Sequence, residues 1–205
     1  MTLAARSKEV SSGYEEIAEW FDANRNKNLM EREYLSIILA RAKQGGNVLD
    51  LGCGTGEPLA KFFIDNGFHV TGIDIAEKMI SICKGRFPAQ EWMVGDIRAF
   101  NLKRTFDVII AFDSFFHIDG QAQREMFPLF RDHAAEGALL MLTSGDEEGE
   151  VYGNMQGIDF YHASLDAAEY QALFRNHGFN VLLHKTKDPA TGERTVWLAQ
   201  KSTAK

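Results

Sequence analysis

The sequence has few cysteines and no apolar run long enough to cross a membrane. Only 2 of its 205 residues are cysteine, Cys53 and Cys83, and their separation suggests reduced thiols rather than a disulfide framework. The longest apolar stretches, such as VIIAFDSFFHI, are broken by charge well before the roughly 18 to 20 residues that a membrane-spanning helix requires. The first residues, MTLAARSKEV, lack the long apolar region of a secretory signal. We therefore expect a protein of the cytoplasm without a membrane span.

The chain also lacks an excess of basic residues. It carries 22 Lys and Arg against 29 Asp and Glu, a formal net charge of -7, and the acidic residues are scattered rather than run together. Such a chain offers no basic stripe with which to neutralise a phosphate backbone, so nucleic acid is a poor expectation as substrate. A small molecule or a modest protein partner is the better one. Neither cysteine has a partner at the spacing of a metal site, and no metal is predicted.

What the sequence does have, from residue 47 onward, is an alternation of short aliphatic runs and longer amphipathic stretches. The runs are typical of buried parallel strands, because helices cover both faces of such a sheet and the usual polar alternation is lost. We expect strands at 47–51, 69–74, 91–96, 106–112 and 138–144, and helices at 57–66, 76–85 and 121–135. This pattern predicts a doubly wound α/β sheet with right-handed crossovers.

The two ends depart from that rhythm. Apolar spacing in residues 7–43 fits two helices, and FNVLLHKTK and RTVWLAQK flank the turn DPATGE, so they should pair as an antiparallel hairpin and bring the sheet to seven strands. Between core and hairpin, residues 145–166 show no clear period and are expected to form a long loop that selects the substrate. We expect one domain, 1–205, made of an N-terminal helical cap (1–45), a ligand-binding core (46–144), a lid (145–166) and a C-terminal helix and hairpin (167–205).

A glycine loop follows the first predicted strand. In NVLDLGCGTGEP, the strand ends in Gly52, Gly54 and Gly56 at alternate positions, followed by Pro58 and an amphipathic run. Glycine permits positive φ angles and the close approach of a ligand to the backbone. A helix that starts directly after the loop offers free N–H groups to an anionic group such as a carboxylate. The segment is therefore typical of a ligand-binding loop.

A dinucleotide site is the nearest competitor for this loop. Its fingerprint has a third glycine three positions after the second, where this chain has Glu57. A carboxylate at the start of a helix would repel a pyrophosphate, whereas a ligand with an amino-acid end and a sulfonium has no such group to repel. Asp50, just before the glycines, would place a negative charge near the ammonium of that ligand or its bridging water. These residues favour S-adenosylmethionine over a dinucleotide.

Two further acids end the second and third predicted strands. Asp74 closes the run HVTGID about twenty residues beyond the loop, where a carboxylate can accept hydrogen bonds from both ribose hydroxyls. Asp96 closes EWMVGD and is followed by Ile97, an arrangement suited to the amino group and ring face of adenine. Three strand ends are therefore expected to converge on one adenosine-type ligand.

The motifs VLDLGCGTGEP, VTGIDIAEKMI, VGDI and FDVIIAFDSFFHI resemble those of class I S-adenosylmethionine-dependent methyltransferases, over roughly residues 10–200. The resemblance implies a Rossmann-like, seven-stranded sheet, mostly parallel with an antiparallel last strand and with helices on both faces. It implies in-line methyl transfer from S-adenosylmethionine, bound across the ends of the first four strands, to a small-molecule acceptor. The cofactor contacts that we expect are Asp50, Gly52, Cys53, Gly54 and Gly56 for the methionine part, Asp74 and Ile75 for ribose and adenine, Asp96 and Ile97 for adenine, and Phe112 at the fourth strand end.

The leading helices supply three further candidates for cofactor contact. In the family that the motifs resemble, aromatic residues of these helices often close over the cofactor, which points to Tyr14 and Trp20. Arg25 could pair with the carboxylate of the ligand. Core packing for the aromatic residues and a solvated surface for the arginine are the competing interpretations.

Asp113, Phe116 and His117 follow the fourth strand, at the rim where the transferred methyl group should emerge. His117, with an unperturbed pKa of about 6.5, could accept a proton from a substrate hydroxyl or amine, and Asp113 is the second catalytic candidate. Tyr161 and His162, together with Phe116, are predicted to contact the substrate. The competing interpretation is that these side chains only pack or cap turns. A sensor of S-adenosylmethionine without chemistry, or an NAD-dependent oxidoreductase, are the alternative functions, and the oligomeric state, monomer or homodimer, stays open.

Overall fold

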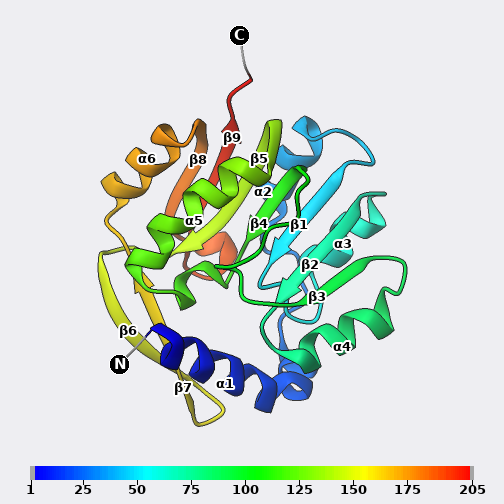
Figure 1. Cartoon of the computed structure of the whole chain (residues 1–205), viewed down its shortest axis with the longest axis vertical. Coiled ribbons are helices and arrows are strands. Elements are labelled where there is room, and N and C mark those ends of the chain that lie inside the picture. Colours follow the sequence, from blue (N-terminus) through cyan, green and yellow to red (C-terminus); the bar gives the residue numbers. More distant parts are fainter. Residues whose placement is uncertain (1–2, 204–205) are drawn as a thin grey trace.

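A seven-stranded sheet forms the centre of the protein (Figure 1). The computed structural model describes residues 3–203, with side chains from residue 10 onward. In sheet order the strands are β3 (Glu91–Val94), β2 (His69–Asp74), β1 (Asn47–Leu51), β4 (Phe106–Ala111), β5 (Ala134–Ser144), β9 (Arg194–Lys201) and β8 (Phe179–Asp188). Strands β1 to β5 run parallel, and β9 lies antiparallel between β5 and β8. The predicted Rossmann-like sheet and its antiparallel last strand are confirmed.

Alternate residues of the strands face two separate hydrophobic clusters. Helices α5 (Gly120–His133) and α6 (Ala167–Asn176) cover one face, and α2 (Arg32–Arg41), α3 (Leu59–Asp65) and α4 (Glu77–Arg86) cover the other. Leu49 and Leu51 belong to the first cluster, and Val48 belongs to the second. Successive side chains of a strand point to opposite faces, so a strand covered on both sides has to be aliphatic throughout.

Residues 145–166, predicted to be an irregular loop, instead form a second, two-stranded sheet. Strand β6 (Gly149–Met155) pairs antiparallel with β7 (Ile158–Ser164) through the turn residues Gln156 and Gly157, whose φ angles of 55° and 79° are those of a type I′ turn. The prediction was wrong because β6 has no buried face. Its neighbouring residues Val151 and Tyr152 are 62% and 53% exposed, so no alternation marks the strand.

Helix α1 (Leu3–Asn24) and the β6–β7 hairpin lie beyond the carboxyl ends of the parallel strands (Figure 1). The helix packs on α4 through Ala18 and Met79, and on β7 through Tyr14, whose ring centroid is 4.6 Å from that of Phe160. From β1 the connections lead toward β3 at one edge of the sheet, and from β4 they lead toward the other edge. Sheets of the α/β type bind ligands at the point between two such strands. The helix and the hairpin therefore enclose the space above that point. Within residues 3–203, no helix combines the length and apolar character needed to cross a membrane.

Candidate functional site

A cavity of about 520 Å³ lies at the carboxyl edge of the sheet, bounded by strand ends, α1 and the hairpin. Its volume falls in the range of roughly 300 to 1,000 Å³ that is usual for small-molecule sites. Most of the residues singled out from the sequence line it. They are Tyr14, Arg25, Asp50, Gly52, Cys53, Gly54, Asp74, Ile75, Asp96, Ile97, Phe112, Asp113, Phe116, His117, Tyr161 and His162.

Two residues predicted to contact the cofactor lie outside the cavity wall. A Cβ on Gly56 would meet the Phe87 ring at 3.1 Å and Cys83 Sγ at 3.3 Å, so this glycine lets the loop pack against α4 and the residue after it. Trp20 is 38% exposed and contributes nothing to the wall, where Phe21 is found instead. Tyr14 and Phe21, seven positions apart, share a helix face, whereas position 20 is rotated by about 100°. Helical spacing from Tyr14 was the signal for choosing Phe21.

Asp74 holds the glycine loop as well as facing the cavity. Its Oδ2 accepts a hydrogen bond from the Gly54 N–H at 2.9 Å, and its Oδ1 accepts one from the Ala76 N–H at 2.9 Å. Burial raises the pKa of this carboxyl, while the backbone N–H groups oppose the shift. Two carboxylate oxygens have about four acceptor positions, so one is left that a ribose hydroxyl can use.

Asp50 places a buried acid at the end of β1, on the cavity wall. The residue is 5% exposed, and burial raises the pKa of its carboxyl to about 7, with Arg25 opposing the shift and Asp74 adding to it. Burial disfavours the charged form of a carboxyl unless an opposite charge lies close by. This part of the cavity is therefore suited to a cationic group.

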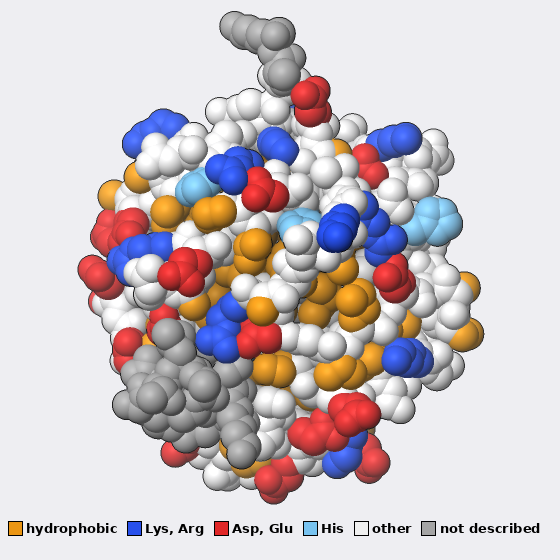
Figure 2. Space-filling model, in the orientation of Figure 1, with side chains coloured by type: hydrophobic (Ala, Val, Ile, Leu, Met, Phe, Trp, Pro, Cys, Tyr) orange, Lys and Arg blue, Asp and Glu red, His pale blue; other side chains and the backbone are white. Residues whose placement is uncertain are grey.

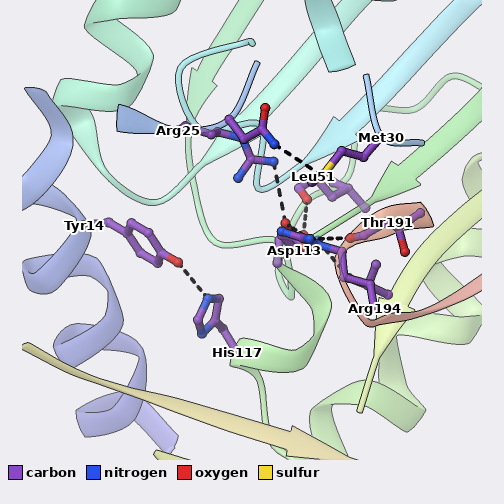
Figure 3. A network of polar contacts seen from close by, with 11 residues as sticks. Tyr14, Arg25, Met30, Leu51, Asp113, His117, Thr191 and Arg194 are labelled. Carbon is purple, nitrogen blue, oxygen red and sulfur yellow. Dashed lines mark hydrogen bonds and ion pairs between the residues drawn. The ribbon is translucent and has the colours of Figure 1, made fainter. Parts of the chain in front are cut away.

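Asp113, two residues after the end of β4, has a φ of 53° and is the centre of an ion-pair network (Figure 3). Arg194 Nε donates to both carboxylate oxygens, at 2.7 and 2.9 Å, and Arg25 Nη2 lies 3.6 Å from Oδ2. Arg194 also donates from Nη1 to the carbonyl oxygen of Thr191 at 2.5 Å. The catalytic role of Asp113 stays a prediction, and the geometry gives its carboxylate two arginine partners. Arg194 was not predicted as a site residue, because no motif marks it.

His117, on the short 3₁₀ helix η1 (Phe115–His117), connects α1 to the hairpin (Figure 3). Its Nε2 is 2.9 Å from the Tyr14 hydroxyl, and its Nδ1 is 2.9 Å from the carbonyl oxygen of Tyr161. A carbonyl oxygen only accepts, so Nδ1 carries the proton and Nε2 accepts from Tyr14. Burial lowers the pKa of His117 to about 4 and raises the pKa of the Tyr14 phenol, so both are neutral at pH 7.

Two other acids of the cavity wall are also paired with arginine or lysine. Asp96 accepts hydrogen bonds from Arg98 Nε at 2.9 and 3.1 Å. Glu57 Oε2 lies 2.7 Å from Lys27 Nζ and 3.3 Å from Arg86 Nη1. The cations around Glu57 offset its charge, so it repels a pyrophosphate less than the sequence argument assumed.

A sheet of this strand order, with a glycine loop after β1 and acids at the ends of β1 and β2, defines a Rossmann-like ligand-binding domain of the class I methyltransferase type. The chain belongs to the methyltransferase-domain family, whose model matches residues 21–184. The resemblance found in the motifs is thereby confirmed.

Relatives in sequence and in fold agree with that membership. The chain is 34% identical over 154 residues to malonyl-[acyl-carrier protein] O-methyltransferase of Bacillus cereus, which covers 72% of this chain and 53% of that protein. It spans about half or less of the length of the curated relatives that it matches, 53%, 33% and 38% for three of them.

The fold is shared with solved methyltransferase structures. The 1,6-didemethyltoxoflavin-N1-methyltransferase of Burkholderia thailandensis aligns with a TM-score of 0.75 at 14% identity, over 98% of this chain and 91% of that one. The magnesium protoporphyrin IX methyltransferase of Synechocystis aligns with a TM-score of 0.73 at 16% identity, over 96% and 97%. At these identities the likeness is one of fold.

Proposed function

We propose that the protein transfers a methyl group from S-adenosylmethionine to a small-molecule acceptor by in-line displacement. One observation carries the proposal. A single cavity joins the buried acids Asp50 and Asp74 and the glycine loop to a wall of rings formed by Tyr14, Phe116 and His162. The acids and the loop suit the cofactor, and the rings suit an acceptor beside it.

The residues proposed to bind the cofactor form groups that would contact different parts of it. Asp50, with Gly52, Cys53 and Gly54, would hold the methionine part, because a buried carboxyl of raised pKa gains most from a cationic ammonium. Arg25 faces the same cavity and suits the ligand carboxylate. The remaining contacts would be Asp74 and Ile75 at the ribose and adenine, and Asp96, Ile97 and Phe112 around the adenine ring.

The chemistry needs little beyond position once the cofactor is bound. S-adenosylmethionine supplies the activated methyl group, and the protein has to hold the nucleophile, methyl carbon and sulfur nearly collinear with water excluded. Proximity and orientation alone can lower such a barrier by roughly 7 to 11 kcal/mol. Helix α1 and the hairpin would provide the enclosure, since both line the cavity.

Surface charge supports a small acceptor rather than a nucleic acid. On the face in Figure 2, basic and acidic side chains are interspersed around a centre with many hydrophobic side chains. Relatives are named for unlike acceptors, a malonyl-[acyl-carrier protein], a dTDP-amino sugar and phosphoethanolamine, so kinship supports the reaction more than any one acceptor. The free thiols of Cys53 and Cys83 support the proposed cytoplasmic location.

An Asp74→Ala protein is expected to bind S-adenosylhomocysteine about 100-fold more weakly than the wild type, measured by titration calorimetry. The change removes charge-assisted bonds to the ribose, each worth about 1.5 to 3 kcal/mol, and the bond to Gly54 N–H. Asp74→Asn, which keeps one acceptor oxygen, should lie between the two. Asp65→Ala on the exposed side of α3 is the matched control and should bind as the wild type does. Wild-type protein that does not bind S-adenosylhomocysteine, or an Asp74→Ala protein that binds unchanged, would contradict the cofactor assignment.

The acceptor is to be sought by incubating cell-extract metabolites with the protein and S-adenosylmethionine and measuring release of S-adenosylhomocysteine. We expect at least one metabolite fraction to be turned over. The methylated product of that fraction is then identified. A larger thermal shift with NADH than with S-adenosylmethionine would favour an oxidoreductase instead. Binding of S-adenosylmethionine without turnover of any fraction would favour a sensor.

A further inference from the structure

We propose that His162, on hairpin strand β7, takes the proton from the methyl acceptor, and that the acceptor therefore arrives as a hydroxyl or an ammonium group. The inference rests on the proposed function and adds a catalytic residue to it. The motifs pointed instead to His117, in the segment that follows the fourth strand. The two rings are neighbours, with centroids 4.8 Å apart, and differ in what their nitrogens do.

His117 has no ring nitrogen left for a substrate. Its Nδ1–H donates to the carbonyl oxygen of Tyr161, and its Nε2 accepts from the Tyr14 hydroxyl, both at 2.9 Å. Taking up a proton at Nε2 would turn that acceptor into a donor facing the Tyr14 hydroxyl. Burial already penalises the charged ring strongly. His117 is thus a positioning residue, which joins α1 to the hairpin across the cavity.

His162 is placed differently. Its side chain lines the cavity, and among the residues that the structure describes neither of its ring nitrogens has a hydrogen-bond partner. The residue is half-buried, so its ring is shielded from bulk water without being enclosed. A neutral imidazole with a free nitrogen at the cavity wall is the side chain best suited to accept a proton near neutral pH.

Packing holds the His162 ring in place. The Phe116 ring centroid lies 4.8 Å from it on one side. On the facing strand β6, a Cβ at Gly153 would come within 3.0 Å of His162 Cε1, so the absence of a side chain there makes room for the imidazole. The ring is therefore held between η1 and β6 by packing, and no described residue forms a hydrogen bond with its nitrogens.

Charged and titratable groups around His162 come from three elements. Burial lowers its pKa, and the carboxylate of Asp113, after β4, opposes that shift. His117 on η1 is neutral at pH 7, and the Tyr14 phenol of α1 lies behind it. The facing positions of β6, Val151 and Gly153, carry no charge. His162 is therefore neutral at pH 7. The Asp113 carboxylate favours the imidazolium that forms during transfer only to the extent that its partners Arg194 and Arg25 leave its charge uncompensated.

The step balances without another reactant. The acceptor O–H or ammonium N–H gives its proton to a His162 nitrogen. A lone pair on the deprotonated oxygen or nitrogen then attacks the methyl carbon. The carbon–sulfur bond breaks with its electron pair staying on sulfur, so the sulfonium becomes the neutral thioether of S-adenosylhomocysteine. The imidazolium then passes its proton to water. A carboxylate acceptor arrives without a proton and needs no such base.

The first test needs no acceptor. The wild-type protein, saturated with S-adenosylhomocysteine, is treated with diethylpyrocarbonate at pH 7 and the modified histidines are quantified by mass spectrometry. Expected is reaction of His162 at a rate nearer that of exposed His69 than that of buried His133, with His117 protected. Reaction of His117 ahead of His162 would overturn the assignment.

The second test uses a panel of primary amines, phenols and carboxylic acids with the wild type, His162→Gln, His117→Gln and the control His69→Gln. We expect turnover of an amine or phenol, with kcat/KM rising with pH through a pKa below about 6.5 and then level. His162→Gln should lower kcat about 100-fold or more and abolish the rise. His117→Gln should mainly raise the acceptor KM and keep the rise, and His69→Gln should change nothing.

Every other outcome counts against the inference. Turnover of carboxylic acids alone, an unaffected His162→Gln protein, or loss of the pH rise in His117→Gln but not in His162→Gln would overturn it. Failure to bind S-adenosylhomocysteine would instead overturn the proposed function. Binding without turnover of any panel member would contradict the transfer step and the base together.

Discussion

A Gly52→Ala protein is expected to be unstable and to bind no S-adenosylhomocysteine at 25 °C. Gly52 has a φ of 75°, which an alanine adopts only at a cost of about 1 to 2 kcal/mol. The added Cβ would also overlap the Cβ of Ser114 and lie 2.8 Å from its Oγ. Because the Ser114 hydroxyl donates to the carbonyl oxygen of Leu51 at 2.6 Å, this side chain cannot move aside without losing a buried bond. Together we expect a loss of about 3 to 5 kcal/mol in the free energy of unfolding.

Urea denaturation of the Gly52→Ala protein measures this loss. The double variant Gly52→Ala/Ser114→Gly removes both atoms of the clash and should be more stable than additivity of the single variants allows, leaving the strain of the φ angle and the loss of the Ser114–Leu51 hydrogen bond. Gly85→Ala, where an added Cβ meets nothing within 4 Å, is the control. A Gly52→Ala protein as stable as that control would show that the loop is not held as the structure describes.

Binding of S-adenosylmethionine is expected to release a proton from Asp50, so its affinity rises with pH through about 7. The pKa of the unliganded carboxyl is raised by burial from its ordinary value of 3.8 to about 7, and a cationic ligand group beside it stabilises the charged form. Calorimetric titration at pH 7 in buffers of different ionisation enthalpy counts the released protons. Identical binding enthalpies in all buffers would contradict the ammonium contact at Asp50.

The same shift predicts the stability of Asp50→Asn without ligand. A raised folded-state pKa contributes stability that is complete below pH 3.8 and is lost as the pH rises through about 7. At pH 8 the wild type therefore carries a penalty of about 4 kcal/mol that the asparagine variant avoids in large part. His117, whose pKa is lowered to about 4, affects stability only below its ordinary value of 6.5, so it does not contribute to the difference at pH 8. Comparing Asp50→Asn with the wild type by urea denaturation at pH 8 cancels the groups that both proteins share, among them Asp74, whose pKa burial also raises. We expect Asp50→Asn to be more stable at pH 8 and to bind the cofactor weakly at every pH.

The elements that could be predicted from the sequence are those whose structure depends mainly on their own residues. The aliphatic strands and the loop of Gly52 and Gly54 were found because covered strands and tight ligand turns restrict residue type locally. The β6–β7 hairpin was not found, because β6 buries neither face and only its turn, Gln156 and Gly157, carries a local signal.

Contacts between distant segments were beyond the reach of the sequence. Arg194 lies 81 residues after Asp113 and meets it only because β9 inserts between β5 and β8. In the same way, the hydrogen bonds that distinguish His117 from His162 depend on where α1 and β7 meet. From residue type alone, His117 and His162 are both candidates for a general base. Only their surroundings in the structure distinguish the roles that we propose for them.

Within residues 3–203, the two-stranded sheet has no backbone ladder with the seven-stranded one. Its length and side chains can therefore change without shifting the register of any strand that holds the cofactor loop. Grafting the corresponding segment of a relative between Gly145 and Leu165 would exchange one wall of the cavity as a unit. The positions of Asp50, Asp74 and the glycine loop would not change. Under the proposed function, one unaltered donor site would serve methyl acceptors of unlike chemistry, with the hairpin as the segment that is exchanged.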